Sequence, residues 1–521
     1  MASTDSTSGP LYNAADDLIG RNLAAGRGNK AAFDDGRRVL SFSDLDRDTR
    51  RLACALSGLG LQHGDRVMLL LHDTVDFPVC FLGALRGGFV PVPVNVRATG
   101  ADIAYMLTDS GARALICDAS LWLTAAPAAA DLEHRIVTGA GAAVPGALSL
   151  DALVASGDPA FPTAATRGGE VGFWLYTSGT TGRPKGVMHR HQSLARTADL
   201  FAIGTLGIGA DDVLFSAPKM FFAYGLGNSL TFALATGATA LLDPERPDPA
   251  RIGALLSRRR PTVFFAVPTL YAMMLAQGVL PCAGAHALRF CVSAGEALPA
   301  ALHARVGARL GVEVLDGLGS TEMLQTFLSN RPGDVRPGTS GKPVAGYRLR
   351  LLDEQGQPIE DADRIGTLEV AGPSSAAGYW GDEPRTRATF RGAWTRTGDA
   401  YCRDGEGYYI HCGRIDDMMK VGGIYVSPQE VETVLAAHPG VAEVAVAGWR
   451  DADGLEKPKA FVVPADPAAA GPALAAELQA MAREQLSPYK YPRWVEFVQA
   501  IPRTVTGKVQ RYRLRQAQPA E

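Results

Sequence analysis

Hydrophobic residues along the first 400 positions alternate between helical and strand-like spacing. Leucines at 45, 52, 56 and 59 recur at intervals of seven, four and three, which predicts the apolar face of a helix. After a break at 60–64, the apolar run 67–71 has the length and composition of a buried strand. Further strands are predicted at 262–267, 289–292 and 312–315. Because helices and strands alternate, the pattern predicts an α/β fold with mostly parallel sheets flanked by helices.

The pattern changes after about residue 366 to shorter strands and turns, which predicts a small β subdomain. A compact α+β unit follows, with predicted helices near 431–435 and 474–486 and strands near 444–447 and 460–463. A chain of 521 residues is too long for one hydrophobic core. We therefore predict a large N-terminal domain over residues 1–415 and a small C-terminal domain over residues 416–521.

Residues 176–186 read YTSGTTGRPKG and follow an apolar run that suits the end of a buried strand. Glycines let backbone N–H groups approach an anion closely, hydroxyls add donors, and a lysine supplies positive charge. The segment therefore predicts a loop that binds nucleotide phosphates, although its composition alone is equally typical of a flexible turn. It is not the Walker A pattern, in which Gly-Lys precedes Ser or Thr. The candidate phosphate-binding residues are Thr177, Ser178, Gly179, Thr180, Thr181, Gly182 and Lys185.

Two further polar, glycine-containing loops follow predicted strands, at 293–296 and 316–322. In open α/β sheets, ligands bind beyond the carboxyl ends of the strands. We therefore expect these two loops and the phosphate-binding loop to surround one site.

Composition and charge narrow the possible partners. A net charge of −3 indicates neither a nucleic acid nor an anionic membrane as partner. We expect no transmembrane helix, because no apolar run reaches about 18 residues, and the first ten residues lack the apolar core of a signal peptide. The seven dispersed cysteines are typical of a reduced, cytoplasmic protein. His189 and His191 lack the further ligands of a zinc site, so we expect packing or hydrogen-bonding roles for them.

Five motifs occur in the order found in the acyl-adenylate-forming superfamily, and the match spans nearly the whole chain. They are the phosphate-binding loop and the segments 316–322, 397–399, 413–417 and 502–508. The chain thus resembles a superfamily that includes acyl-CoA synthetases, carrier-loading adenylation domains and firefly-type luciferases. Within that group, APKMFFAYGLGN at 217–228 and GSTEML at 319–324 resemble the benzoate–CoA ligases.

The resemblance implies a two-step reaction with ATP, Mg²⁺ and coenzyme A. A carboxylate attacks the α-phosphate of ATP and releases pyrophosphate, and the thiol of coenzyme A then displaces AMP. The site must neutralise charge while it aligns two anions. By resemblance, Glu322 would bind Mg²⁺, a hard cation that prefers oxygen ligands, and Thr321 would contact the α-phosphate. Asp399 would take the ribose hydroxyls, and Arg414 would reach the ribose or the phosphate. The residues expected to line the adenine are Ser293, Ala294, Gly295, Glu296, Asp316 and Gly317.

The resemblance also implies that the small C-terminal domain is mobile. Lys508 would reach the carboxylate and the α-phosphate and stabilise charge in the first step. Asp416 matches the hinge position, where a few residues absorb a large change of φ and ψ. Gly422 and Gly423 would leave room for the pantetheine arm of coenzyme A, because they carry no side chain.

A candidate pocket for an aryl acid follows from the same resemblance. Its expected residues are Phe221, Phe222, Ala223, Tyr224, Gly225, Gly319, Gln325 and Thr326. Aromatic side chains suit the faces of a ring, and small residues give depth, although an ordinary core segment has similar composition. Benzoate ligases often have His and Ile where this sequence has Gln325 and Thr326. Because this departure adds hydrogen-bonding capacity and a buried polar group needs a partner, we predict a benzoate with a polar substituent. We place 2-aminobenzoate (anthranilate) ahead of the hydroxybenzoates.

Two other activities remain open at this point. A stand-alone adenylation enzyme would share the first half-reaction but load an acyl carrier protein, and a catalytically silent paralogue would only bind. The joint presence of Lys185, Glu322, Asp399 and Lys508 argues against a silent paralogue. The absence of Walker A argues against a P-loop kinase or ATPase. The sequence leaves open the preferred acid and whether the protein is a monomer or a homodimer.

Overall fold

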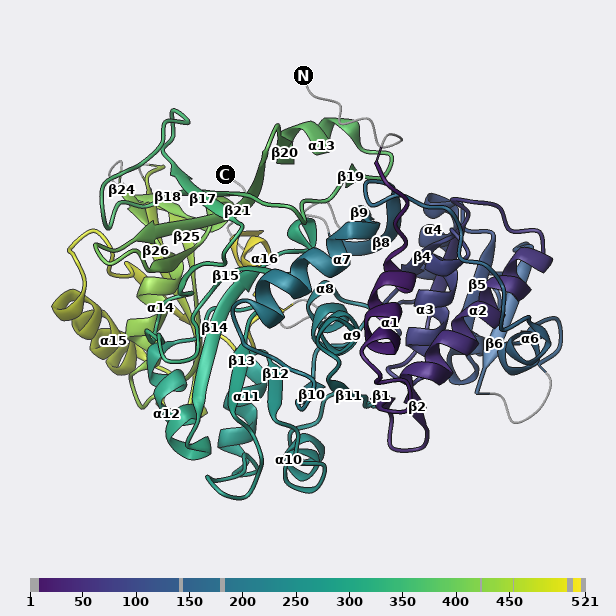
Figure 1. The fold of residues 1–521 in the computed structure, drawn as a ribbon. Helices are drawn as coiled ribbons and strands as arrows, with labels where there is room; N and C mark the ends of the chain where they lie inside the picture. The colour runs from purple at the N-terminus through teal and green to yellow at the C-terminus, as the bar shows by residue number, and fades with distance from the viewer. Residues whose placement is uncertain are drawn as a thin grey trace. The chain divides into compact units, whose positions relative to one another are not determined.

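The computed structural model describes residues 9–139, 144–178, 183–421, 424–452, 454–503 and 509–516 (Figure 1). They form two compact units. Unit 1 holds the described residues of Met1–Pro337, Pro343–Arg348 and Val370–Thr395, and unit 2 holds those of Gly338–Lys342, Leu349–Glu369 and Arg396–Glu521. The domain boundary near Asp416 and the mobility of the C-terminal domain stay predictions.

A five-stranded parallel sheet forms the first part of unit 1, in the order β4-β3-β5-β6-β7. Its strands are β3 (Arg66–Leu70), β4 (Val90–Pro93), β5 (Ala114–Asp118), β6 (His134–Thr138) and β7 (Leu148–Ser149). The predicted strand at 67–71 corresponds to β3, in which the last four residues are buried. Short elements η1 (Ala119–Leu121), α5 (Trp122–Ala125) and α6 (Leu150–Ser156) connect the later strands.

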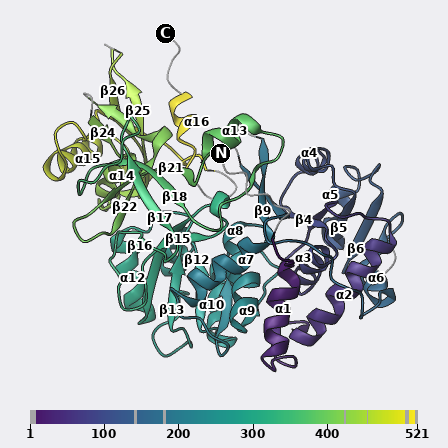
Figure 2. The ribbon, with the colours of Figure 1, turned by 45° about the horizontal axis from the view of Figure 1, so that its top comes forward.

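Three helices of this region lie side by side (Figure 2), namely α1 (Ala14–Ala24), α2 (Phe42–Gly58) and α3 (Asp76–Arg86). A fourth helix, α4 (Gly100–Ser110), follows β4. The predicted leucine face is confirmed in α2 for Leu45, Leu52 and Leu56, which are buried, whereas Leu59 follows the helix as its C-cap and is only partly buried. A capping box starts this helix: the Ser41 hydroxyl accepts the backbone N–H of Asp44, and the Asp44 side chain accepts that of Ser41.

The central sheet has nine strands in the order β16-β15-β14-β13-β12-β10-β11-β1-β2. The strands from β1 and β11 through β14 run parallel, whereas β2 and β15 are antiparallel to their neighbours, which confirms the predicted, mostly parallel α/β fold. Their bounds are β1 (Ala31–Asp34), β2 (Val39–Ser41), β10 (Val213–Ser216), β11 (Thr239–Leu241), β12 (Val263–Ala266), β13 (Phe290–Ser293), β14 (Glu313–Gly319), β15 (Thr326–Ser329) and β16 (Lys342–Pro343).

Helices cover this sheet and bury its apolar strands. Three of them, α10 (Pro249–Arg258), α11 (Pro268–Ala276) and α12 (Ala300–Leu310), lie side by side along it (Figure 1) and share a core with Phe264 of β12. The segments between β9 and β11 are α7 (His191–Thr197), the π-helices η2 (Ala198–Ile203) and η3 (Leu226–Thr231), α8 (Ala223–Gly225) and α9 (Phe232–Thr236).

A small antiparallel sheet, β19-β9-β8, completes unit 1. Its strands are β8 (Val171–Ser178), β9 (Pro184–Arg190) and β19 (Gly378–Tyr379). Two short elements, α13 (Glu383–Thr389) and β20 (Phe390–Arg391), follow β19 in the chain, and a third, η4 (Thr321–Met323), follows β14.

The predicted shortening of the strands in the later part of the chain is wrong. There β21 (Trp394–Arg403) spans 10 residues, because it pairs with β20 and with β22 (Tyr409–Arg414) at different points along its length, whereas β8, the longest strand before residue 330, spans 8. One sheet contains β17 (Arg348–Leu352), β18 (Gly366–Ala371), β21 and β22 together with β20. Within unit 2, the α+β region that follows η5 (Ile415–Asp417) has its own hydrophobic core, to which Val431, Val446 and Leu478 belong. Its elements are β23 (Met419–Val421), β24 (Ile424–Val426), α14 (Pro428–Ala436), β25 (Val441–Arg450), β26 (Glu456–Pro464), η6 (Pro467–Ala469), α15 (Pro472–Gln485), β27 (Trp494–Phe497) and α16 (Arg511–Gln516).

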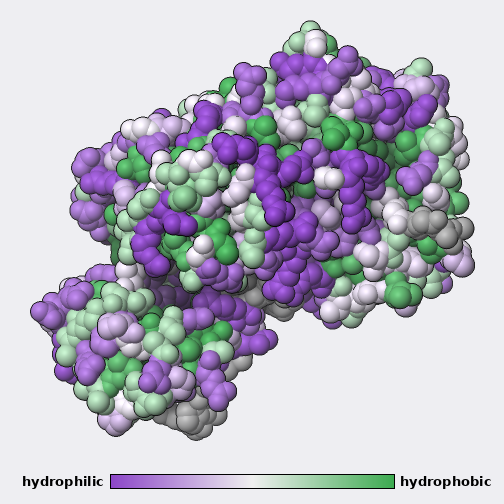
Figure 3. All heavy atoms as spheres, turned by 90° about the horizontal axis from the view of Figure 1, so that it is seen from below, coloured by the Kyte–Doolittle hydropathy of each residue, from purple (hydrophilic) through white to green (hydrophobic). Residues whose placement is uncertain are grey.

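Hydrophilic residues cover much of the face shown in Figure 3, and hydrophobic residues lie between them in separate patches. Among the helices of the described residues, we find none that combines the length and the apolar character needed to cross a membrane.

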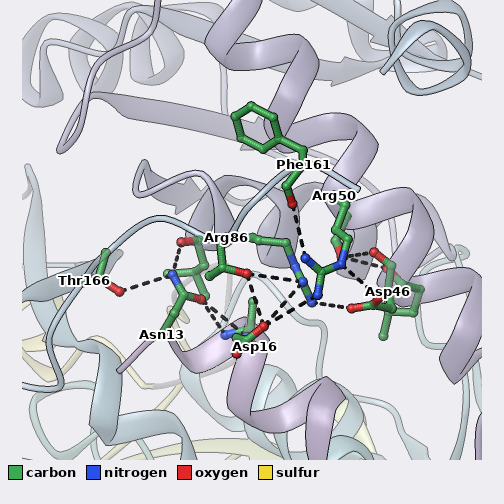
Figure 4. Close-up of polar contacts among 12 residues, drawn as sticks. Asn13, Asp16, Asp46, Arg50, Arg86, Phe161 and Thr166 are labelled. Carbon is green, nitrogen blue, oxygen red and sulfur yellow. Dashed lines mark hydrogen bonds and ion pairs between the residues drawn. The ribbon is translucent and has the colours of Figure 1, made fainter. Parts of the chain in front are cut away.

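A buried arginine joins the three N-terminal helices (Figure 4). Arg86, at the end of α3, is fully buried, and its guanidinium lies 2.8 Å from Asp46 of α2 and 3.6 Å from Asp16 of α1. Arg50 completes the network, because it pairs with Asp46 at 3.0 Å and donates to the Phe161 carbonyl at 3.2 Å. The network thus fixes α1, α2 and α3 to the segment that leads into β8.

His191 is a second buried ionisable residue that joins segments remote in sequence. Its side chain is 2% exposed, and its Nδ1 accepts the backbone N–H of Ala14 at 3.4 Å. Burial lowers the pKa of His191 from 6.5 to about 4. The imidazole is therefore neutral at pH 7 and links the start of α7 to α1.

We predict that Arg86→Met lowers the free energy of unfolding by about 3 kcal/mol, because it removes the buried partner of Asp46. Urea unfolding at pH 7.5 measures this change. Arg47→Met is the matched control, since Arg47 lies on α2, pairs with Asp44 and Asp48 and is 44% exposed. It should cost at most about 1 kcal/mol. Equal losses in the two variants would contradict the role assigned to the buried network.

We predict that His191 makes the fold sensitive to acid. Because its pKa is lower in the folded chain than in the unfolded one, the unfolded state takes up the proton first as the pH falls below about 6.5. Between pH 7.5 and pH 5, this residue should remove about 2 kcal/mol of stability. In urea unfolding, the free energy of unfolding of His191→Gln should therefore fall between pH 7.5 and pH 5 by about 2 kcal/mol less than that of the wild type. If the stability curves of the variant and the wild type were parallel between pH 5 and pH 7.5, the prediction would be refuted. Between pH 7.5 and pH 8.5, where His191 is neutral in both states, the two curves should be parallel.

Candidate active site

The hairpin of β8 and β9 presents the predicted phosphate-binding segment. Thr177 ends up opposite Lys185 in the antiparallel register, and the Tyr176 hydroxyl anchors the hairpin by donating to Asp109 at 2.6 Å. Four of the candidate residues, Gly179, Thr180, Thr181 and Gly182, lie outside the described residues, and Ser178 is described only as the last residue of β8. The hairpin therefore brings Thr177 and Lys185 to the two sides of the predicted loop.

Lys185, a predicted phosphate-binding residue, lies beside Glu322, the predicted Mg²⁺ ligand. The Lys185 ammonium is 3.6 Å from Glu322 Oε1, and the Tyr379 hydroxyl donates to the same oxygen at 2.7 Å. The ammonium also lies 3.9 Å from the centre of the Tyr379 ring, close enough for a cation–π interaction. Burial lowers the pKa of Lys185, while Glu322 opposes that shift. Tyr379 is a site residue that the sequence did not indicate, because it lies 57 positions from Glu322.

The turn η4 carries Thr321 and Glu322 directly after β14. His189 of β9 lies within hydrogen-bonding distance of the Thr321 carbonyl, with Nε2 at 2.8 Å. Its ring stacks on Phe173 at a centroid distance of 5.1 Å. The hydrogen-bonding role expected for His189 is thus confirmed. Leu324, which follows the turn, has a φ of 66° and a ψ of −44°, and the Gln325 N–H donates to the Met323 carbonyl at 2.8 Å, so the backbone reverses there in a γ-turn.

The residues expected around an adenine lie at the carboxyl ends of β13 and β14. Ser293 and Asp316 are register partners of these two parallel strands. Burial raises the pKa of Asp316 well above its usual value, while the nearby Ser293 hydroxyl opposes that shift. By distance and angle, however, neither Asp316 Oδ1 nor the Ser293 hydroxyl has a hydrogen-bond partner among the described residues. A ligand with polar groups would satisfy such buried atoms. Glu296 instead accepts from the Thr269 hydroxyl at 2.6 Å and from its backbone N–H at 3.1 Å. Ala294, Gly295 and Gly317 occupy the same strand ends.

The predicted aryl-pocket residues come together from α8 and the start of β15. Gln325 Nε2 donates to the Tyr224 carbonyl at 3.2 Å and to Asn228 Oδ1 at 3.4 Å. Gln325 Oε1 accepts from the backbone N–H and the hydroxyl of Thr326, both at 3.0 Å. Gln325 is buried, and a Cβ at Gly227 would overlap its Nε2. The amide of Gln325 is therefore bonded on both sides within the protein.

Aromatic residues and a close backbone approach complete this region. The rings of Phe221 and Phe222 have centroids 4.6 Å apart, and Ala223 and Gly225 begin and end α8. A Cβ at Gly319 would lie 2.9 Å from the backbone of Gln325, so a side chain at Gly319 would force the two segments apart.

An aspartate that the sequence did not indicate holds the segment before Phe221. The Met220 backbone N–H lies 3.1 Å from Asp73 Oδ1 and 3.3 Å from its Oδ2. Burial raises the pKa of Asp73 to about 6, while Lys219 opposes the shift. No motif marks Asp73, because it lies in a loop 147 positions before Met220.

The remaining predicted residues belong to unit 2. Asp399 and Arg414 are register partners of β21 and β22, and their side chains lie 3.0 Å apart. Asp399 also donates its backbone N–H to the Thr397 hydroxyl at 3.1 Å. Asp416 lies in η5. Gly422, Gly423 and Lys508 lie outside the described residues.

The donor set around Glu322 fits a magnesium ion better than a structural metal. Over the described residues, no three histidines, cysteines or acidic side chains gather to hold a metal by themselves. Mg²⁺ is commonly bound through one or two carboxylates together with substrate phosphates. Glu322 would supply such a carboxylate next to Lys185, which lies at one side of the predicted phosphate-binding loop.

The chain is similar to known proteins over nearly its whole length. The AMP-binding enzyme family matches residues 21–380, and the AMP-binding enzyme C-terminal domain matches residues 430–508. A benzoate–CoA ligase of Thauera aromatica is 53% identical over 510 residues, which cover 97% of this chain and 96% of that protein. The solved structure of a benzoate CoA ligase from Burkholderia xenovorans LB400 has a TM-score of 0.88 and 46% identity, and covers 97% of this chain and 100% of the other. An anthranilate CoA ligase solved with anthranoyl-AMP has a TM-score of 0.90 and 39% identity, with 97% of each chain covered. The protein therefore belongs to the AMP-binding enzyme family.

Proposed function

We propose that this protein is an ATP-dependent aryl-CoA ligase of the benzoate–CoA ligase type. The proposal rests on the arrangement of unit 1. Lys185 and Glu322 lie 3.6 Å apart, and the segment from Asp316 to Gln325 runs through β14 and η4 and contains Glu322. One continuous segment thus connects the expected nucleotide, metal and aryl-acid residues. The similarity to benzoate–CoA ligases over nearly the whole chain supports the same activity.

In the first half-reaction, a carboxylate oxygen of the aryl acid attacks the α-phosphorus of ATP, and the bond to the leaving pyrophosphate breaks. Both reactants are anions, so neutralising charge is the main task of the site. Lys185 and the phosphate-binding loop would hold the β- and γ-phosphates, and Thr321 would contact the α-phosphate. Mg²⁺, when bound by Glu322, would supply further positive charge to the phosphates.

In the second half-reaction, the sulfur of coenzyme A attacks the carbonyl carbon of the aryl adenylate, and AMP leaves. Asp399 and Arg414 would bind the ribose, as the family resemblance implies, and Asp316 and Ser293 would face the adenine. Gly422 and Gly423 would admit the pantetheine arm. Asp416 would act as the hinge between the two half-reactions.

We propose benzoate, with an unsubstituted ring, as the preferred acid. The amide of Gln325 is the polar group that the sequence offers to a ring substituent, but Tyr224, Asn228 and Thr326 already occupy both of its ends. A substituent would have to replace one of these bonds. Anthranilate remains the alternative acid, supported by the similarity to an anthranilate CoA ligase.

We further propose a cytoplasmic location, because all seven cysteines are free thiols. The chain acts on small molecules in this proposal, and both a monomer and a homodimer are compatible with it.

A pyrophosphate-release assay with a panel of aryl acids tests the activity and the choice of acid. We predict that benzoate has the highest kcat/KM, with anthranilate and the hydroxybenzoates lower by at least about tenfold, because a displaced hydrogen bond costs about 1.4 kcal/mol. Free coenzyme A should be consumed in proportion to pyrophosphate. If AMP were released only when an acyl carrier protein is added, the protein would load a carrier instead. A preference for anthranilate would overturn the proposed choice of acid.

Lys508 provides a separate test of the two-step scheme. We predict that Lys508→Ala lowers the rate of aryl-AMP formation by about 10²- to 10³-fold, the usual effect of removing one charge-stabilising group. Thioester formation from preformed aryl-AMP should change only a few-fold. Lys457→Ala is the control, because Lys457 lies on β26 of the same unit and has no assigned role. Equal losses in both half-reactions would contradict the role of Lys508.

A further inference from the structure

The turn η4 is held by hydrogen bonds to three consecutive backbone carbonyls. The Thr321 carbonyl lies 2.8 Å from His189 Nε2, the Glu322 carbonyl accepts the Ala376 backbone N–H at 2.8 Å, and the Met323 carbonyl accepts the Ser374 hydroxyl at 2.8 Å. All three donors lie far from the turn in the sequence. A three-residue turn has little rigidity of its own, so these bonds fix the direction of its side chains.

The first of these bonds has a defined polarity. A carbonyl can only accept, so Nε2 of His189 carries the hydrogen and donates it to Thr321. The side chain is fully buried, and burial lowers its pKa to about 3, which keeps the ring neutral. Nδ1 has no hydrogen-bond partner among the described residues. An aromatic hydrocarbon ring would stack on Phe173 without leaving such an atom unpaired, so packing does not account for a histidine here.

His189 also shares a strand with Lys185. Both residues belong to β9, and Lys185 lies 3.6 Å from the Glu322 carboxylate. The strand therefore contacts the turn twice, through the Lys185 ammonium and through the His189 N–H. A shift of the turn along β9 would break both contacts together.

The bond to Met323 has its own support. Ser374 is fully buried, and its hydroxyl lies 2.7 Å from the Tyr347 hydroxyl. Since the single hydroxyl hydrogen of Ser374 goes to Met323, Tyr347 donates to Ser374. This chain of two hydroxyls anchors the far end of the turn, after Glu322.

We propose that His189 is a positioning residue that sets Thr321 and Glu322 at their distance from Lys185, with Ser374 as its counterpart at the other end of the turn. The inference rests on the proposed function, in which these three residues bind MgATP. His189 touches neither reactant in this proposal, and it acts through the backbone of the turn.

Three variants test the proposal. His189→Phe keeps an aromatic ring against Phe173 but lacks the donor, and His189→Gln keeps a side-chain N–H. His191→Phe is the matched control, because His191 is equally buried and two positions away but bonds to Ala14 instead of the turn. Isothermal titration calorimetry with MgATP, in the absence of any acid, measures binding. Steady-state kinetics then give kcat and the KM for ATP and for benzoate.

We expect His189→Phe to weaken MgATP binding and to slow aryl-AMP formation by about 10- to 100-fold, as is usual when a residue that orients metal-site groups is removed. The KM for benzoate should stay within about twofold, and His189→Gln should recover most of the loss. Wild-type affinity for MgATP in His189→Phe would overturn the proposal. So would equal losses in His191→Phe, or a folded His189→Gln no better than His189→Phe.

If His189→Phe does not fold, Ser374→Ala provides the same test at the other end of the turn. It should weaken MgATP binding about tenfold, and unchanged binding would overturn the proposal in that case. A wild-type protein that binds MgATP but activates no aryl acid would refute the proposed function instead, so the two failures are distinguishable.

Discussion

The ion pair between Lys185 and Glu322 is the interaction on which the proposed site depends. Both side chains are less than one-fifth exposed, so each charge is largely removed from water and needs the other. Their separation of 3.6 Å is longer than a direct hydrogen bond, and the Tyr379 hydroxyl takes up the nearer position on the carboxylate. An anion that approaches Lys185 and a cation that approaches Glu322 can therefore replace the pair without leaving either charge unpaired.

Maintaining that pair requires segments that are remote in the chain. Lys185 comes from a hairpin, Glu322 from the turn between β14 and β15 of the central sheet, and Tyr379 from a short third strand that pairs with the same hairpin. The hairpin is itself fixed at its base, where the Trp174 and Trp380 rings lie 4.6 Å apart. The rigid elements thus supply the geometry, and the polar side chains lie at their ends.

The sequence predicted the parts of this site whose residues are close together in the chain. The strands β12, β13 and β14 lie where apolar runs indicated them, and β8 contains the apolar run that precedes the segment 176–186, although the strand continues to Ser178. One difference is that β14 extends to Gly319, because the polar segment after residue 315 pairs with β15 in the antiparallel direction. The composition of residues 316–319 could not indicate this extension of β14, because the segment is extended through its pairing with β15 and not through the preference of its side chains.

Contacts across long separations could not be predicted in this way. Neither Tyr379 nor Asp73 lies in a motif, and only the fold brings them to Glu322 and Met220. Arg86 would ordinarily be assigned to the surface, yet the fold encloses it between aspartates of two other helices.

Gln325 shows why a residue type alone does not decide specificity. Its departure from the usual histidine suggested a polar substituent on the acid, since an unpaired buried amide would need a partner. The fold supplies those partners from Tyr224, Asn228 and Thr326. A site rejects a substrate strongly when a missing group leaves a buried polar atom unpaired. With its amide already bonded, Gln325 would impose no such penalty on an unsubstituted ring, and it joins the segments of Tyr224, Asn228 and Thr326 instead.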